Sequence, residues 1–234
     1  MSFHGWMGKI LRVDLNKKKI SSQSLTKEQS EMFLGGRGLG VEMLFREIPR
    51  GTDPLSPENK LIFATGPLTG TGAPTSGRYS VITRSPLTGT VFDSNSGGHF
   101  GVQLKRCGLD AVIVEGKAEK PSYLWMHDET LEIRKAEHVW GFSTHKTEDI
   151  IKSETSKDAK VACIGPAGEK QVLISAIMND KHRAAGRGGV GAVMGSKQLK
   201  AIAVQGSHET SIADREEFTA AARVSLEAIM KNPV

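Results

Sequence analysis

Glycine is concentrated in three stretches of this sequence, at residues 66–78, 93–101 and 182–197, and each stretch also carries hydroxyl, amide or arginine side chains. Because glycine has no Cβ, it lets the backbone approach a ligand and adopt turns that other residues avoid. Each stretch is therefore either a ligand-binding loop or a closely packed turn. Whichever it is, the rest of the chain must fold around these three segments.

The first stretch, residues 66–78, follows an apolar strand-like segment and precedes another. Its threonine and serine hydroxyls can donate hydrogen bonds. Arg78 ends the stretch with a planar guanidinium that suits a phosphate or the polar edge of a ring. The alternative is a long hairpin loop with a surface arginine.

The second stretch, residues 93–101, leads from short polar residues through Gly97 and Gly98 into a predicted helix. A helix N-terminus presents unpaired N–H groups that favour a phosphate, and the side-chain carbonyl of Asn95 is a suitable ligand for Mg²⁺. The alternative is that Asn95 or Ser96 only caps the helix.

The third stretch, residues 182–197, combines small residues with cationic ones. Glycines and alanines leave the backbone open to a flat or phosphorylated ligand, while Arg183 and Arg187 supply charge. A P-loop is excluded because Lys197 comes after serine instead of before it. The dinucleotide fingerprint is absent as well. A tight structural turn is the alternative.

Alternating and apolar segments predict a strand at residues 9–15 and, after a turn at 16–18, a second short strand that completes a hairpin. Further strands are predicted at residues 61–65, 79–83, 90–92, 111–115, 122–126, 131–134, 161–164, 172–177 and 200–204. Helices are predicted at residues 26–34, 39–47, 98–106, 143–153 and 215–231, with a turn at 35–38 between the first two. Strands and helices do not alternate regularly, which favours an α+β fold with mixed sheets over a doubly wound one.

No low-complexity linker interrupts the first 206 residues. We therefore predict one domain over residues 1–208. The helix predicted at 215–231 would begin a following helical domain, truncated here, at 209–234.

Composition excludes several classes of function. The two cysteines, Cys107 and Cys163, are too few for a cysteine-only cluster and lie in apolar surroundings, so no disulfide framework is expected. A net charge of +5 with dispersed Lys and Arg argues against nucleic-acid binding. No apolar run is long enough to span a bilayer, and the first ten residues are unlike a signal peptide. We expect a cytoplasmic protein.

Taken together, residues 66–71 with 73–78, residues 95–101 and residues 179–197 resemble the N-terminal domain of the aldehyde:ferredoxin oxidoreductase family. The resemblance extends through residues 53–60, 115–121 and 164–169, and so covers nearly the whole chain. It implies a β-rich base for a tungsten (or molybdenum) cofactor held by two pterins, with electrons leaving through a [4Fe–4S] cluster to ferredoxin. The cluster cysteines and catalytic groups of the family belong to later domains, so this chain alone is expected to be inactive.

The resemblance also implies roles for individual residues. Arg78 would contact a pterin between cofactor and cluster, and Asn95 with the Ala184 backbone carbonyl would ligate a Mg²⁺ that bridges pterin phosphates. The residues implied to line the cofactor site are Arg78, Asn95, Ser96, Gly97, Gly98, Arg183, Ala184, Ala185 and Gly186.

The implied activity is oxidation of aldehydes to carboxylic acids. Partners would be the rest of the oxidoreductase and ferredoxin, with a homodimer left open. The alternative is a free-standing, non-catalytic module that binds a pterin or nucleotide or serves in assembly.

Overall fold

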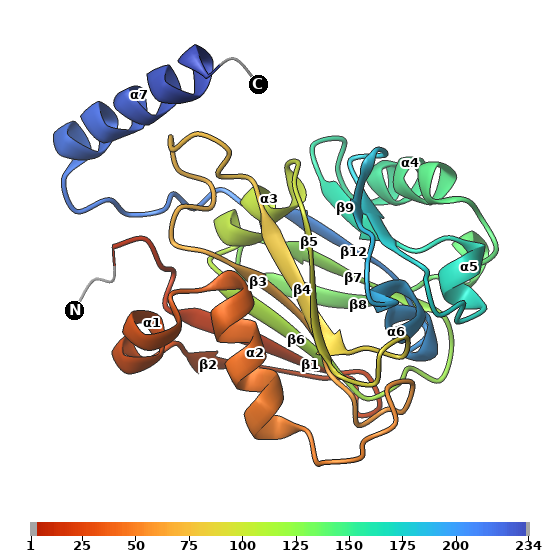
Figure 1. Ribbon diagram of the computed structural model, residues 1–234. Coiled ribbons are helices and arrows are strands. Elements are labelled where there is room, and N and C mark those ends of the chain that lie inside the picture. The colour runs from red at the N-terminus through yellow and green to blue at the C-terminus, as the bar shows by residue number, and fades with distance from the viewer. Residues whose placement is uncertain (1–3, 233–234) are drawn as a thin grey trace.

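The computed structural model describes residues 4–232 and contains two six-stranded mixed sheets (Figure 1). The α+β class predicted from the sequence is confirmed. Residues 1–3 of the predicted domain 1–208 and residues 233–234 of the predicted domain 209–234 lie outside the described residues.

The first sheet has the strand order β2-β1-β6-β3-β4-β5. Its strands are β1 (Lys9–Asp14), β2 (Lys19–Ser24), β3 (Leu61–Thr65), β4 (Tyr79–Arg84), β5 (Val91–Ser96) and β6 (Ala111–Glu115). Only the β1–β6 pair is parallel. Strand β5 is therefore one free edge of this sheet.

The second sheet has the strand order β11-β10-β9-β12-β7-β8. Its strands are β7 (Ser122–His127), β8 (Thr130–Lys135), β9 (Lys160–Cys163), β10 (Ile177–Asn179), β11 (Arg183–Ala185) and β12 (Leu199–Gln205). The β12–β7 pair is parallel, and β11 forms an edge.

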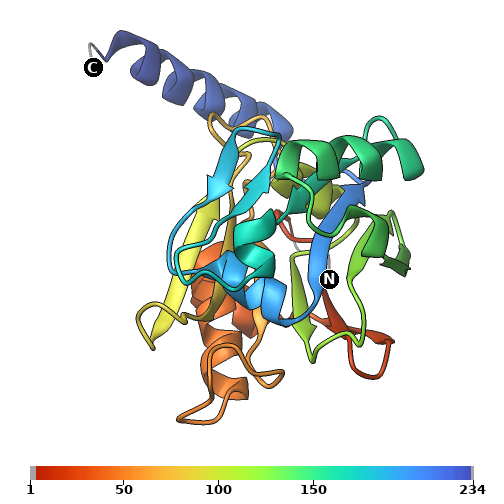
Figure 2. The same cartoon turned by 90° about the vertical axis from the view of Figure 1, so that its right-hand side faces the viewer.

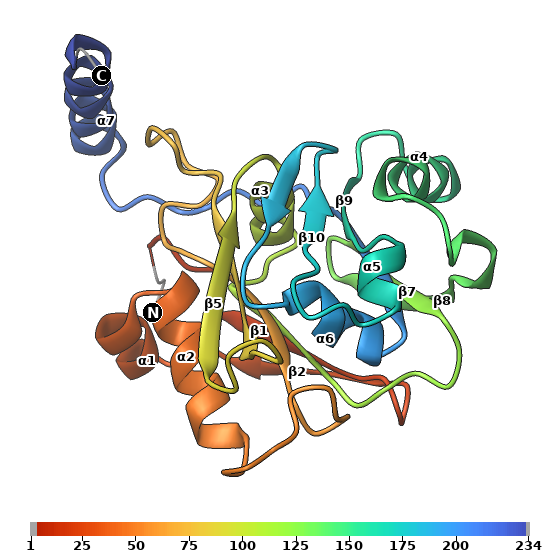
Figure 3. The same cartoon turned by 45° about the vertical axis from the view of Figure 1, so that its right-hand side comes forward.

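The helices are α1 (Lys27–Phe33), α2 (Gly36–Glu47), α3 (Phe100–Arg106), the 3₁₀ helix η1 (Glu137–Val139), α4 (Thr144–Glu154), α5 (Pro166–Glu169), α6 (Val190–Ser196) and α7 (Arg215–Lys231). Helix α2 covers the outer face of the first sheet and α4 that of the second (Figures 1 and 3), while α3 and α6 contribute to the core between the sheets.

Strand alternation produces three buried layers. Side chains such as Phe63, Val112 and Ile202 point into the central core between the sheets. Their neighbours Ile62 and Ile113 point the other way, into a second core under α2, and Ala201 and Ala203 face α4 in a third. Successive strand residues point to opposite faces, so a strand buried on both sides is apolar throughout.

The helix starts follow their sequence signals where a side chain caps them. Thr26 and Gln29 form a reciprocal capping box on α1, and Ser143 caps α4. Helix α2 is different, because it begins at Gly36 and not at residue 39 as predicted. A Cβ on Gly40 would overlap the Ile82 side chain, so close packing on β4 overrides the low helix propensity of glycine.

Two strand predictions near the glycine-rich stretches were inaccurate. Residues 172–177 are mostly a turn in which Ser175 N–H donates to the Val172 carbonyl at 2.8 Å, and the strand there is Ile177–Asn179. Strand β5 continues to Ser96 because polar residues 93–96 pair with β4. The ladder thus extends into the stretch predicted as a loop, and neither Asn95 nor Ser96 caps α3, whose N-cap is His99.

Helix α7 projects away from the two-sheet body, as Figure 2 shows, and buries none of its residues. Its exposed apolar side chains include Val224, Leu226, Ile229 and Met230. The assignment of residues 209–234 to a separate helical domain remains a prediction.

Candidate functional site

The edge strands of the two sheets, β5 and β11, lie beside each other (Figure 3). This junction, here called the β5–β11 margin, brings Asn95 at the end of one strand near Arg183–Ala185, which form the other. A hydrogen bond from the Arg187 N–H to the Ser94 hydroxyl, 3.1 Å long, crosses between them. The second and third glycine-rich stretches therefore converge, although the residues joined by this bond are 93 positions apart in sequence.

A buried hydrogen-bond network centred on Asn179 fixes this margin, and we call it the Asn179 clasp. The Asn179 Oδ1 accepts from the Tyr79 hydroxyl at 3.0 Å and from the Ser96 hydroxyl at 2.7 Å. Its Nδ2 donates to the Gly97 carbonyl at 2.9 Å and to Asp180 at 2.8 Å. Burial raises the pKa of Tyr79 above its ordinary value, so its hydroxyl stays a donor.

Asp180 extends the clasp to the start of α3. Its Oδ2 accepts from the His99 N–H at 2.7 Å. Gly98 has φ +92, and a Cβ there would overlap the same carboxylate oxygen. Because only glycine combines this backbone conformation with the available space, the turn at Gly97–Gly98 has a single well-defined shape.

The first glycine-rich stretch places Arg78 at the start of β4, beside the margin. An Arg78 guanidinium nitrogen donates to Asn95 Oδ1 at 3.3 Å. Thr69 joins the two ends of this loop, because its hydroxyl accepts from the Gly66 N–H at 3.0 Å and donates to the Arg78 carbonyl at 3.2 Å. Arg78 also lines a cavity of about 370 Å³ between this loop and the start of α2.

Positive charge near the margin is only partly balanced. Within residues 4–232, the guanidinium groups of Arg183 and Arg187 make no hydrogen bond or ion pair, and that of Arg78 meets only a neutral amide. Asp93 is bound to Arg37 at 2.9 Å, and Asp180 is engaged by the clasp. Free guanidinium groups at an exposed strand edge favour an anionic ligand, phosphate above all.

The backbone leaves room for such a ligand at two glycines. No atom lies within 4 Å of where a Cβ of Gly97 would be, and at Gly186 only the Ala184 methyl does, at 3.7 Å. Ser96 and Ala185, in contrast, turn their side chains inward and are buried. Of the residues implied by the resemblance, these two would therefore contribute backbone only.

Two oxygen donors fit a magnesium ion at the margin. Asn95 is exposed, and its Oδ1, which accepts from Arg78 with one lone pair, has a second one. Strand β11 is an edge strand, in which alternate carbonyls face away from β10. In the described part of the chain no three His, Cys, Asp or Glu side chains are grouped to hold a metal. Mg²⁺ is commonly held by one or two protein oxygens plus phosphates and water, so this sparse set suits it.

The cysteines are unsuited to hold a cluster. Cys107 and Cys163 are both free and buried. Burial raises the pKa of each thiol to about 12. Since a cluster ligand is a thiolate, any cluster would take its ligands from other residues.

The second half of the third stretch has a structural role. Residues Val190–Ser196 form α6, which is buried throughout, and a Cβ on Gly195 would overlap the Gly168 carbonyl. The buried Lys197 ammonium donates to the carbonyls of Asn59, Pro57 and Gly116. Here the tight-packing interpretation is correct, and the exclusion of a P-loop agrees with it.

Sequence reasoning missed the residues that hold the site in shape. Asn179, Asp180 and Thr69 fall within the stretches that carry the resemblance, but no role was predicted for any of them individually. An Asn-Asp pair in an otherwise apolar strand context was the available signal, because buried amides need partners.

The fold and the margin define a two-sheet α+β domain with an arginine-bearing edge, and comparison with known proteins assigns that domain to a family. Residues 10–206 match the family described as aldehyde ferredoxin oxidoreductase, N-terminal domain. The chain therefore belongs to the aldehyde ferredoxin oxidoreductase family and carries its N-terminal domain.

Similar proteins include "Tungsten-containing aldehyde ferredoxin oxidoreductase" of Pyrococcus abyssi, 54% identical over 98% of this chain, and "Aliphatic sulfonate oxidoreductase, WOR-like subunit" of Pyrococcus furiosus, 40% identical over 87%. The chain spans 38% of the first protein's length and 35% of the second's.

A solved structure, the "Active site complex BamBC of Benzoyl Coenzyme A reductase in complex with 1,5 Dienoyl-CoA", superposes with a TM-score of 0.95. The two chains are 38% identical, and the match covers 97% of this chain and 35% of the other.

Within the described residues, no helix is long and apolar enough to cross a membrane.

Proposed function

We propose that this chain is the cofactor-binding platform of a tungsten oxidoreductase that oxidises aldehydes to carboxylic acids and delivers the electrons to ferredoxin. The β5–β11 margin carries the proposal, because three arginines without a carboxylate partner converge there on open backbone. The names of the tungsten-containing relatives supply the cofactor and the reaction.

In this proposal the chain's residues bind and orient, and they take no part in bond making. Arg183 and the backbone at Gly97 and Gly186 would hold phosphate groups of the pterins, with Asn95 and the Ala184 carbonyl on a Mg²⁺ between them. Arg78 would place a fixed positive charge at the edge of a pterin. When bound, the metal and its pterin sulfurs would supply the two-electron chemistry.

The Asn179 clasp would preserve this geometry when the ligand binds. A site that is already ordered loses little conformational entropy on binding, so its affinity is higher than that of a flexible loop. Apart from the Asp180 carboxylate, which accepts from an amide and a backbone N–H, the clasp consists of neutral groups, so it offsets little of the positive potential that the arginines present to the ligand.

The remainder of the enzyme, which the relatives carry in the rest of their length, would complete the site and supply the cluster ligands. Aldehydes are favoured as substrates over sulfonates because identity to the aldehyde oxidoreductases is 54% against 40% for the sulfonate protein.

Elemental analysis for W, Mo, Mg and Fe, combined with a fluorescence assay for oxidised pterin, tests the proposal on the full-length protein. We expect the protein to contain tungsten, magnesium and about two pterins for each tungsten. A folded protein that binds phosphate compounds but contains neither tungsten nor pterin would contradict the proposal and favour a non-catalytic binding module.

A further inference from the structure

A second cavity lies at the other end of β4 from Arg78. Its volume is about 400 Å³. Residues from the end of α2 and from the β4–β5 hairpin line it: Phe45, Ile48, Pro49, Arg50, Arg84 and Val91. At roughly 3.3 Å per strand residue, Arg84 is about 20 Å from Arg78. The cavity is therefore separate from the β5–β11 margin.

Within residues 4–232, Arg50 and Arg84 are the only charged residues that line this cavity, and neither guanidinium group has a partner. The Arg84 Nε is buried and has no hydrogen-bond acceptor. Among the described residues, the guanidinium groups of Arg84 and Arg50 make no hydrogen bond or ion pair. The acid at the end of α2, Glu47, is already bound to Arg12 and Lys60. Because the buried Nε is out of reach, an occupant would meet the terminal nitrogens of these unpaired guanidinium groups, which favour a ligand that brings an acceptor.

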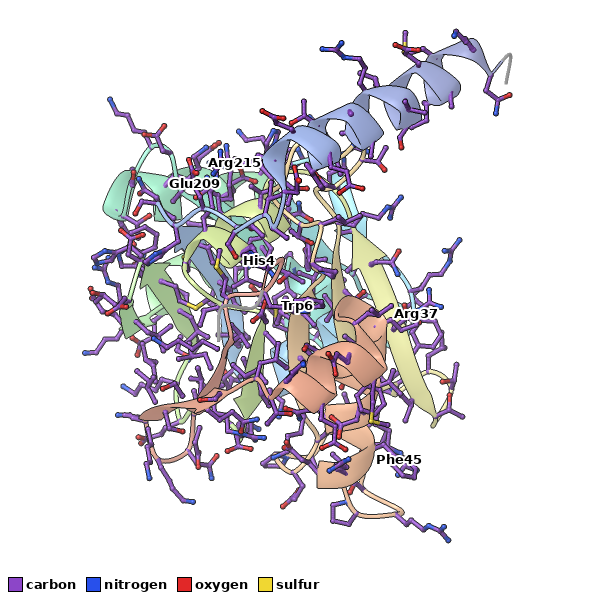
Figure 4. The ribbon with its side chains drawn as sticks, turned by 90° about the vertical axis from the view of Figure 1, so that its left-hand side faces the viewer. His4, Trp6, Arg37, Phe45, Glu209 and Arg215 are labelled. Carbon is purple, nitrogen blue, oxygen red and sulfur yellow. The ribbon has the colours of Figure 1, made fainter. Side chains whose placement is uncertain are left out.

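The opposite wall of the cavity is apolar and exposed. The Phe45 side chain projects from the outer side of α2, as Figure 4 shows, and is 78% exposed. Ile48 and Pro49 continue this wall, and Val91 faces the mouth at 39% exposed. An exposed aromatic ring beside unpaired guanidinium groups suits a ligand with an apolar body and one anionic end.

The end of α2 also limits the charge of the ligand. Carbonyl groups at a helix C-terminus carry partial negative charge, which disfavours a phosphate dianion more than a single carboxylate. The planar fork of Arg84 matches a carboxylate in geometry.

We propose that this cavity binds a small organic carboxylate, with the carboxylate on Arg84, assisted by Arg50, and the apolar or aromatic body against Phe45. This site goes beyond the proposed function and does not depend on it, since none of the residues implied to hold the cofactor lines this cavity.

Benzoate is a suitable probe, titrated against the purified full-length protein by ligand-detected NMR, with neutral benzamide as its matched analogue. We expect saturable benzoate binding that benzamide does not show. Arg84→Gln should weaken it at least tenfold. Arg46→Gln is the control: it removes the same charge from α2 outside the cavity, and should change benzoate affinity less than twofold. Neither variant should change tungsten or pterin content.

Several results would overturn the assignment. These are equal binding of benzoate and benzamide, equal losses in the Arg84 and Arg46 variants, or tighter binding of inorganic phosphate than of benzoate. Absence of benzoate binding would do so as well, and would indicate that an acidic side chain from another part of the full-length protein occupies the cavity. Should Arg84→Gln fail to fold, the variants Arg50→Gln and Phe45→Ala test the assignment instead. Each is expected to weaken benzoate binding at least threefold.

Discussion

The β5–β11 margin and the loops remote from it are held by different kinds of buried polar group. At the margin, the Asn179 clasp uses neutral amide and hydroxyl groups with one carboxylate at its rim. Elsewhere, three fully buried lysines, Lys105, Lys197 and Lys200, tie loops to the sheets.

This difference has an electrostatic reason. A buried ammonium at the margin would add to the repulsion among the free arginines there, whereas neutral donors add none. The remote lysines bind carbonyls and buried acids instead, such as Lys105 with Asp110 at 2.6 Å. The remote anchors should therefore be more costly to break and sensitive to pH, while the clasp should be insensitive to pH and important for shape.

The largest effect is expected at the Lys200–Glu169 ion pair, in which both side chains are at most 5% exposed. Lys200→Met leaves the Glu169 carboxylate buried without its counter-ion, and should lower the free energy of unfolding by about 3–5 kcal/mol. Urea denaturation measures this loss. The double variant Lys200→Met with Glu169→Gln should recover a large part of it, and a loss below about 1 kcal/mol in the single variant would show that the pair is not an anchor.

A smaller effect is expected when the clasp is broken. Asn179→Ala leaves Tyr79, Ser96 and the Gly97 carbonyl without their buried partner, which should cost about 3 kcal/mol. Asn95→Ala is the matched control, because Asn95 is exposed on β5, and should cost less than about 0.5 kcal/mol. Equal melting temperatures for the two variants would refute the distinction between clasp and surface.

The two glycines at the turn sharpen the comparison further. Gly98→Ala places a methyl group against Asp180 in a backbone conformation with φ +92, and we expect a loss of about 2 kcal/mol. Gly97→Ala has free space around the new methyl group and should be nearly neutral in stability. Thermal unfolding of both variants tests this, and a neutral Gly98→Ala would mean that the turn is not constrained by the clasp.

The smallest effect concerns pH. Burial lowers the pKa of Lys197 to about 7 from an ordinary value of 10.5. As pH rises above about 7, the folded state releases this proton while the unfolded state keeps it, so stability increases by about 1 kcal/mol between about pH 7 and about pH 8. Lys197→Met should lack that increase, whereas Asn179→Ala should keep it. Denaturant curves at the two pH values measure the slopes, and identical slopes in wild type and Lys197→Met would be the contrary result.

Much of the fold could be predicted from the sequence because its signals are local. The capping box at Thr26 and the apolar runs of β3, β6 and β12 define their elements without tertiary information. The start of α2 and the helix α6 could not be predicted, because their glycines are explained only by the backbone or side chains that they touch, such as the Gly168 carbonyl beside Gly195.

The same limit applies to the candidate site. Arg78, Asn95 and Arg183 were predicted from glycine-rich context and from the resemblance, and the structure brings the strands that carry them together. The buried hydrogen bonds of Asn179 were not predicted, because its partners Tyr79 and Ser96 are 100 and 83 residues away. The ligand roles of Arg78, Asn95 and Arg183 remain a proposal.

The most direct test of the central claim, that the free arginines of the β5–β11 margin hold cofactor phosphates, is the pterin and tungsten content of the full-length Arg183→Gln protein. Arg223→Gln, on the exposed face of α7, serves as the charge-matched control. We predict that Arg183→Gln unfolds at the wild-type temperature but contains at least tenfold less pterin and tungsten, while Arg223→Gln keeps both. Full cofactor content in Arg183→Gln would contradict the account.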